Sequence, residues 1–229
     1  LFRSSGEESA VMKGLLVKDF KLMKNQKNFF LMIFLLSIAF MGMDGGENFI
    51  VGFLTFICSL FSISTISYDE FDNGNAFLFT LPFNRADYVR EKYCFGLIAG
   101  IAACVVGTII SSAAILIKNT GVDILEWLPA CFTFIIIDLL FLSFLLPFQL
   151  KFGAERGRIA LLIGFGILFV IAFLAVKLMA ALNVDIDAIV ENMTAAGLTG
   201  LFVFCFFAAA ACTLVSYRIS RAVVNHKEF

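Results

Sequence analysis

Charged residues and histidine are scarce in this chain of 229 residues. Lys, Arg, Asp and Glu together make up 15% of it, and His226 is the single histidine. A soluble domain usually covers its surface with roughly a quarter or more of charged residues. The composition therefore excludes an ordinary water-exposed globule, a disordered chain and a free nucleic-acid-binding domain.

The common catalytic and metal-binding motifs are also missing. The sequence contains no GxxxxGK[ST] phosphate-binding loop, no HExxH and no GxSxG. Its six cysteines form no CxxC pair and lie in or beside apolar runs. This placement indicates packing residues rather than a disulfide framework or a zinc site. We expect no catalysis and no cofactor in this chain itself.

Apolar residues, by contrast, make up 61% of the chain, and the mean hydropathy is +0.96. A soluble domain has about 45–50% apolar residues. A helix that crosses a bilayer needs about 20 mostly apolar residues, and six runs qualify or nearly qualify. They are Phe29–Met43, Asn48–Tyr68, Tyr93–Ile117, Trp127–Phe148, Arg158–Leu182 and Ala196–Ile219. We predict an all-α integral membrane protein with six transmembrane helices.

The basic residues predict the orientation. Six spans place both termini on one side, and 15 of the 17 Lys and Arg residues fall on that side. Only Lys118 and Lys177 lie on the other side or near it. Basic residues accumulate in cytoplasmic loops. We therefore predict a multi-pass protein of the plasma membrane with cytoplasmic N and C termini.

The N-terminal region divides into two parts. Residues 1–11 are polar and precede Met12, so we interpret them as an expression remnant or a disordered extension. Residues 12–229 then form a single six-span domain. Leu16, Phe20 and Met23 recur at helical spacing, which predicts an amphipathic helix at the membrane surface with its lysines toward anionic lipid. A plain basic flank that only sets topology is the alternative.

The longest predicted cytoplasmic loop, Asp69–Lys92, carries an unusual apolar stretch, Ala76–Leu81. An apolar stretch outside any span must be buried under the bundle, in the membrane interface or on a partner protein. Periodicity alone does not choose between these. After Pro82, Asn84 is placed to cap a helix that starts at Arg85.

One acid, Asp138, falls near the middle of the fourth predicted span. A charge at that depth costs on the order of 2.5–3.5 kcal/mol, so the side chain should face the bundle or a wet cavity. Lys177 on the fifth predicted span is a conceivable partner. Asp138 is either a polar point on a transport path or dimer seam, or an acid bonded to a Ser or a backbone carbonyl.

Several short motifs resemble one protein family. Met12–Phe20 resembles the start of permease subunits of type-2 ATP-binding cassette (ABC) exporters. Tyr68–Phe71 and Phe79–Pro82 resemble the first cytoplasmic loop of that family, and Pro147–Gly153 resembles its second loop. Within the family, the chain is most similar to permeases that export phenol-soluble modulins, which are amphipathic peptide toxins.

The resemblance implies how the missing ATPase motifs are supplied. In such exporters, ATP and Mg²⁺ are bound by a separate ATPase subunit in two copies, and two permeases pair as a homodimer or heterodimer. A coupling helix in the first cytoplasmic loop would insert into a groove on the ATPase. The implied docking residues are Asp69, Glu70, Phe71, Asp72, Phe77, Leu78 and Phe79. A second cytoplasmic contact would comprise Lys151, Phe152, Glu155 and Arg156.

The expected function is therefore that of a permease in an ATP-driven exporter of amphipathic peptides or other hydrophobic cargo. Two alternatives stay open at this point. One is a secondary transporter that works without ATP, although Asp138 is the one acid deep in a predicted span. The other is a membrane scaffold or immunity protein with no transport. Neither reading involves nucleic acid.

Overall fold

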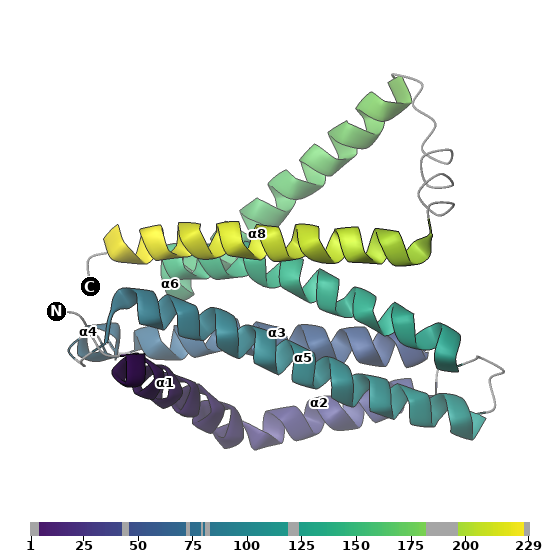
Figure 1. Ribbon diagram of the computed structural model, residues 1–229, viewed down its shortest axis with the longest axis horizontal. Coiled ribbons are helices and arrows are strands. Elements are labelled where there is room, and N and C mark those ends of the chain that lie inside the picture. Colours follow the sequence, from purple (N-terminus) through teal and green to yellow (C-terminus); the bar gives the residue numbers. More distant parts are fainter. Residues whose placement is uncertain are drawn as a thin grey trace.

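The computed structural model describes residues 5–42, 46–71, 74–78, 80, 83–118, 124–181 and 197–226. These described residues are helical apart from short turns and connections (Figure 1). The helices in chain order are α1 (Ser5–Asn25), α2 (Lys27–Phe40), α3 (Gly46–Glu70), α4 (Gly74–Leu78), α5 (Arg85–Lys118), α6 (Ile124–Ala181) and α8 (Leu198–His226). The all-α class predicted from composition is confirmed for this part of the chain.

Four helical segments are long and apolar enough to cross a membrane: Gly46–Glu70, Arg85–Lys118, Trp127–Gly153 and Gly200–His226. They correspond to the second, third, fourth and sixth predicted spans. The first predicted span forms α2, whose 14 residues extend only about 21 Å, less than the ~30 Å hydrocarbon thickness of a bilayer. The fifth predicted span lies within α6 as far as Ala181. A total of six spans therefore stays a prediction.

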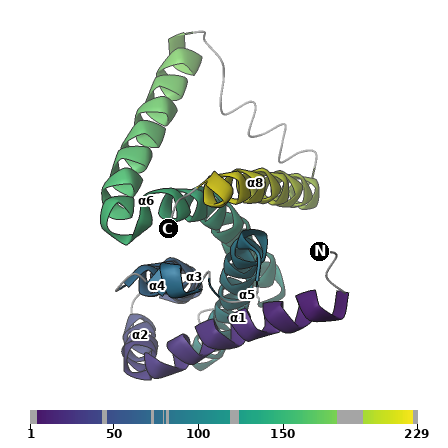
Figure 2. The same cartoon turned by 90° about the vertical axis from the view of Figure 1, so that its left-hand side faces the viewer.

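The long helix α6 changes direction at Gly153. This residue has φ 73° and ψ −173°, a region of backbone space that essentially only glycine occupies. Before Gly153, α6 packs along the bundle beside α8. After Gly153, it leaves the bundle at a wide angle, as two perpendicular views show (Figures 1 and 2).

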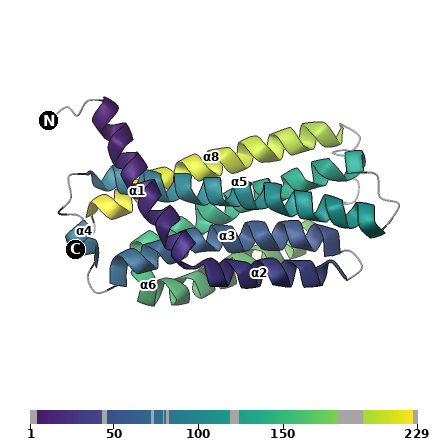
Figure 3. The ribbon, with the colours of Figure 1, turned by 90° about the horizontal axis from the view of Figure 1, so that it is seen from below.

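Helix α1 lies across one end of the bundle and meets α5 and α3 there (Figure 3). Residues 5–11, which the sequence separates from the domain, form its first turns. The start of α1 and the end of α8 lie at this same end of the bundle (Figure 1). The connection between α3 and α5, which includes α4, also lies there. We call this the coupling end.

The predicted start of α5 is confirmed. The helix begins at Arg85, and the Asp87 carboxylate accepts a hydrogen bond of 3.1 Å from the backbone N–H of Asn84. Such a bond satisfies one of the donors left free at a helix N-terminus. The loop is thereby joined directly to a helix that runs the full length of the bundle.

Candidate functional site

The connection between α3 and α5 exposes two aromatic rings at the coupling end. Phe71 follows the last residue of α3 and is 73% exposed, and Phe77 in α4 is 71% exposed. The next residue, Leu78, is buried and packs with Ile66, Tyr88 and other residues of α3, α5, α6 and α8. Asp72 and Phe79 lie outside the described residues. Of the predicted docking side chains, Phe71 and Phe77 are thus available to a partner, whereas Leu78 anchors α4 to the bundle.

The base of this connection is held by buried charges. Nζ of Lys92 lies 2.5 Å from Oδ2 of Asp19 and 2.8 Å from Oδ2 of Asp69. Lys18 reaches Oδ1 of Asp69 at 2.5 Å, and the Tyr88 hydroxyl donates to Oδ2 of Asp69 at 3.1 Å. Asp69, predicted as a docking residue, is therefore turned into the bundle, where it ties α3 to α1 and α5. We call Lys18, Asp19, Asp69, Glu91 and Lys92 the charge cluster.

Asp19 is the completely buried member that α1 contributes. Burial would raise the pKa of its carboxyl, but the charges of Lys92 and Lys18 and the hydrogen bond from Lys92 outweigh that effect. Together they hold the pKa of Asp19 below its usual range. The carboxylate is thus ionised at neutral pH and attracts the ammonium group of Lys92 on α5.

Further hydrogen bonds join α5 to α8 at the same end. Arg85 donates to the backbone carbonyls of Val224 at 3.1 Å and Asn225 at 2.9 Å. These carbonyls lie in the last turn of α8, where a positive charge also interacts favourably with the helix dipole. The Tyr93 hydroxyl lies 2.6 Å from Ser216 Oγ on α8. Both ends of the connection between α3 and α5 are therefore tied to other helices. Asp69 at the end of α3 is bonded to α1 and α5, and Arg85 at the start of α5 is bonded to α8.

The second predicted contact lies next to the first. A side-chain carbon on Gly153 would approach Oε2 of Glu70 to 2.7 Å, so the end of α3 touches the bend in α6. Around this bend, Lys151 and Arg156 are exposed and Phe152 is 39% exposed. The Glu155 side chain is not among those described. The structure thus brings the two predicted cytoplasmic contacts together at one end.

The predicted amphipathic face of α1 is only partly turned to the bundle. Leu16 and Met23 are half-buried, while Phe20 is 40% exposed and its ring meets that of Phe95 edge-on, with centroids 5.2 Å apart. Among the α1 side chains that the structure describes, from residue 10 onward, Leu15 and Asp19 are fully buried in the bundle. Polar attachment therefore supplements the apolar face that the sequence predicted.

Asp138 is placed at the junction of three helices. Its carboxylate, 5% exposed, accepts a hydrogen bond from Ser59 on α3. Gly100 on α5 makes room for it, since a side chain there would collide with the carboxylate. Lys177 is exposed and lies over the Phe173 ring at 5.7 Å. The structure thus joins Asp138 to Ser59, which matches the interpretation of an acid bonded to a Ser.

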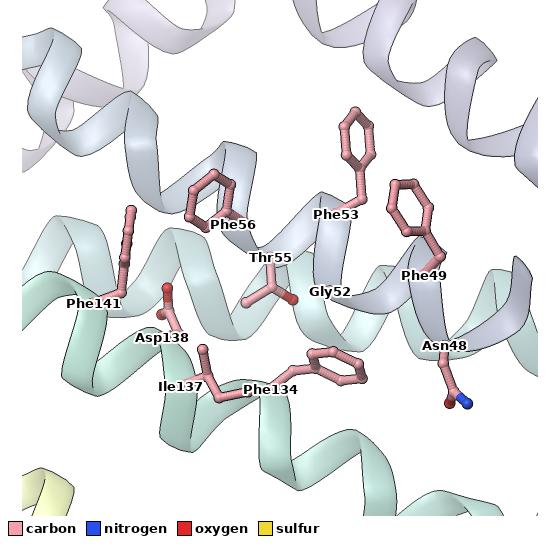
Figure 4. A pocket seen from close by; sticks show the side chains of 10 residues that line it. All are labelled: Asn48, Phe49, Gly52, Phe53, Thr55, Phe56, Phe134, Ile137, Asp138 and Phe141. Carbon is pink, nitrogen blue, oxygen red and sulfur yellow. The ribbon is translucent and has the colours of Figure 1, made fainter. Parts of the chain in front are cut away.

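An aromatic groove of about 350 Å³ runs between α3 and α6 beside Asp138 (Figure 4). Aromatic rings from both helices form most of its walls, and Asn48 lies at one end. The lining residues include Phe49, Phe53, Phe56, Phe134, Ile137 and Phe141. Grooves of this size and apolar character are typical of sites for small hydrophobic groups.

Sequence reasoning missed the charge cluster. In the sequence, Asp19 only interrupts the amphipathic pattern of α1, and Lys92 is one of the basic residues that indicate topology. The available signal was an acid on the apolar side of a helix together with Glu91 and Lys92 directly before an apolar run. Such residues must find partners when they are buried.

The helices and their hydropathy define a multi-pass α-helical membrane protein. Residues 14–225 match the family model described as ABC-2 family transporter protein, and the chain belongs to this family. The family resemblance predicted from sequence is thereby confirmed. A membrane subunit of this family is a transport component rather than an ATPase, and it works with a partner ATPase subunit. No curated protein and no solved structure matches the chain.

Proposed function

We propose that this chain is the permease of an ATP-driven exporter, with two ATPase subunits docking at the coupling end of two paired permeases. The ATPases bind ATP and Mg²⁺, and the permeases carry amphipathic peptides or other hydrophobic cargo outward. In this proposal the coupling end faces the cytoplasm, six segments cross the membrane, and both termini are cytoplasmic. Export of phenol-soluble modulin-like peptides is the narrower form of the same proposal.

The observation that carries the proposal is the pair of exposed rings at Phe71 and Phe77. Their connection lies at one end of the bundle, beyond the apolar middle of α3 and α5. Fully burying a Phe side chain stabilises a complex by about 1.5–3 kcal/mol. Two exposed rings on a short, anchored segment therefore provide a compact hydrophobic contact for a partner.

The hydrogen bonds and ion pairs of the coupling end support transmission of movement. Asp69 lies two residues before Phe71 and is bonded to α1 and α5 through Lys18 and Lys92. Arg85 joins the other end of the connection to α8. A displacement of this connection by the ATPases would thus pull on four helices together. The free energy for this movement comes from the difference in nucleotide affinity between the two conformations of the ATPase–permease complex.

The aromatic groove between α3 and α6 supports hydrophobic cargo. Six of its ten lining residues are Phe or Ile, and the other four are Asn48, Gly52, Thr55 and Asp138. Such a surface favours apolar side chains or hydrocarbon over a strongly charged solute, because an unpaired charge loses its hydration there. This is the basis for proposing amphipathic or hydrophobic molecules rather than ions.

Docking is tested by replacing Phe77 with Asp and, separately, Phe71 with Asp. Each variant should still insert and fold but lose co-purification of the ATPase, because a charge replaces an apolar contact. Phe77→Leu is the matched control, since it keeps an apolar side chain at the same place and should retain the ATPase. Normal recovery of the ATPase with both Asp variants would refute docking through these rings.

Transport is tested in proteoliposomes that contain the permease alone or with its ATPase. Export of an amphipathic peptide should require both proteins and hydrolysable ATP. ATP-independent uptake or release by the permease alone would instead support the secondary transporter.

A further inference from the structure

The charge cluster holds more acid than base. Asp19, Asp69 and Glu91 contribute three carboxyl groups, whereas Lys18 and Lys92 contribute two ammonium groups. Asp19, Glu91 and Lys92 are completely buried, so water does not stabilise any excess charge on them. The cluster therefore needs another positive charge or one neutral carboxyl group.

Lys92 has no proton left for Glu91. The three oxygens nearest to its Nζ belong to Asp19 at 2.5 Å, Asp69 at 2.8 Å and Thr65 at 3.1 Å. An ammonium group carries three hydrogens, and these oxygens match them in number. Oε2 of Glu91 lies further away, at 3.5 Å, and receives no hydrogen bond from it.

Glu91 and Asp19 both have buried carboxyl oxygens that accept no hydrogen bond from the described residues. They are both carboxyl oxygens of Glu91 and Oδ1 of Asp19, and Nζ of Lys18 forms an ion pair with Oδ1 of Asp19 at 3.2 Å. The two carboxyl groups lie around the same ammonium group, with Oδ2 of Asp19 at 2.5 Å and Oε2 of Glu91 at 3.5 Å from Nζ of Lys92. Two ionised carboxylates repel and cannot bond, whereas one protonated carboxyl donates to the other. Asp19 is the ionised partner because it pairs with Lys92.

We propose that Glu91 is a proton-binding site, and that its neutral carboxyl donates a hydrogen bond to Oδ1 of ionised Asp19, which joins α5 to α1 through one proton. This site lies directly beneath the connection that carries Phe71 and Phe77. Loss of the proton places a second negative charge beside Asp19 and weakens the attachment of α1. The proposal concerns the permease alone and does not depend on what it transports.

The charged and titratable groups around Glu91 come from three helices. They are Lys18 and Asp19 on α1, Asp69 on α3, and Tyr88, Lys92 and Cys94 on α5. Burial and the charge of Asp19 favour the neutral form of Glu91, whereas Lys92 and Lys18 favour its ionised form. Attachment of α1 is thus strongest where Asp19 is ionised and Glu91 is protonated, and it weakens as the pH rises.

Infrared difference spectroscopy of the purified full-length protein tests the proton directly. At neutral pH, the spectrum of wild type minus Glu91→Gln should contain the carbonyl stretch of a protonated carboxylic acid. This band should shift on exchange into D₂O. A difference spectrum with only ionised carboxylate bands would overturn the proposal.

A pH profile of thermal unfolding in detergent is the second readout. Glutamine is the neutral analogue of protonated Glu91, since its amide also donates to Asp19. The melting temperature of wild type should fall relative to Glu91→Gln between neutral and alkaline pH. Parallel profiles of the two proteins would overturn the proposal.

Asp19→Asn gives an independent route in case Glu91→Gln does not fold. In Asp19→Asn, burial still favours neutral Glu91, but the negative charge that accepts its hydrogen bond is replaced by a neutral amide and the two lysines favour the ionised form. The acid band should then disappear or shift at neutral pH. An acid band that is unchanged in Asp19→Asn would assign the proton elsewhere and overturn the proposal.

Discussion

Lys92 is completely buried, and its ammonium group is surrounded by oxygens of Asp19, Asp69 and Thr65. Removing a charge from water costs several kcal/mol, which a buried ion pair recovers only with good geometry and additional hydrogen bonds. These contacts come from α1, α3 and α5. The residue therefore specifies how three helices meet, in addition to any net gain in stability.

Replacing Lys92 with Met should destabilise the protein strongly. The change removes the buried cation that Asp19 and Asp69 share and leaves them with the partly exposed Lys18, and breaking a buried pair typically costs about 3–5 kcal/mol. Unfolding in detergent at neutral pH measures the effect. Lys21→Met is the control, because Lys21 is exposed on α1 and its loss should change stability by no more than about 0.5 kcal/mol. Equal stability of the two variants would contradict this account of Lys92.

The depressed pKa of Asp19 predicts a stability that is lost in acid. Its pKa in the folded protein lies below the ~3.9 of an unfolded chain, so folding favours the ionised form. The resulting stabilisation is fully present above that value and disappears as the pH falls through the lower, folded pKa. Wild type should therefore melt above Asp19→Asn at neutral pH, and the difference should close in acid. A difference that widens in acid would show the opposite sign of coupling.

At the scale of single elements, α6 shows how one residue redirects a helix. Its apolar sequence continues on both sides of the bend, so hydropathy alone indicates two spans without an angle between them. The angle arises at Gly153, whose backbone conformation other residues adopt only under strain. The carboxylate of Glu70 lies against the same residue and would have to move aside for a side chain there.

Gly153→Ala should therefore be destabilising. The strained backbone costs about 1–3 kcal/mol, whereas the carboxylate of Glu70 can move aside. Gly200→Ala in α8 is the control, since no heavy atom lies within 4 Å of the added carbon. In a helix, that change should be neutral or stabilising by up to about 1 kcal/mol. Thermal unfolding of both variants measures the difference, and Gly153→Ala should melt at the lower temperature. Similar melting temperatures would show that the bend tolerates a side chain.

At the scale of the whole molecule, the two ends of the bundle differ in character. One end carries α1, the charge cluster and the exposed rings at Phe71 and Phe77. The opposite end carries Lys118, which pairs with Glu47 at 3.5 Å, and Trp127, which donates to Asn48 at 2.7 Å. Helix α5 connects the two ends over about 51 Å, long enough to cross the membrane and extend beyond it.

Cysteine labelling tests the proposed orientation of these ends. In a background without native cysteines, Phe77→Cys should react with a membrane-impermeant thiol reagent only after the cells are opened. Lys118→Cys should react in intact cells, because it lies at the other end of α5. Labelling of Phe77→Cys from outside would reverse the topology and remove the basis for cytoplasmic ATPase docking.

Hydropathy and charge in the sequence were sufficient to predict a helical membrane protein and the position of its long spans, and the capping residue Asn84 was sufficient to predict the start of α5 at Arg85. These properties depend on residues that are close together in the sequence, within a turn or a single span, so they can be read without knowing which helices touch. The motifs of the two loops also indicated the family. Side-chain contacts between residues that are far apart in the sequence were not predictable from hydropathy, charge or motifs.

Only the tertiary structure decided that Asp19 meets Lys92, that Leu78 faces inward while Phe77 faces outward, and that Ser59 rather than Lys177 bonds to Asp138. Each outcome depends on which surfaces of distant helices touch. Among the described residues, buried acids outnumber buried bases, and several pairings satisfy the same composition. Which one forms depends on helix packing, because partners within hydrogen-bonding distance come from residues far apart in sequence.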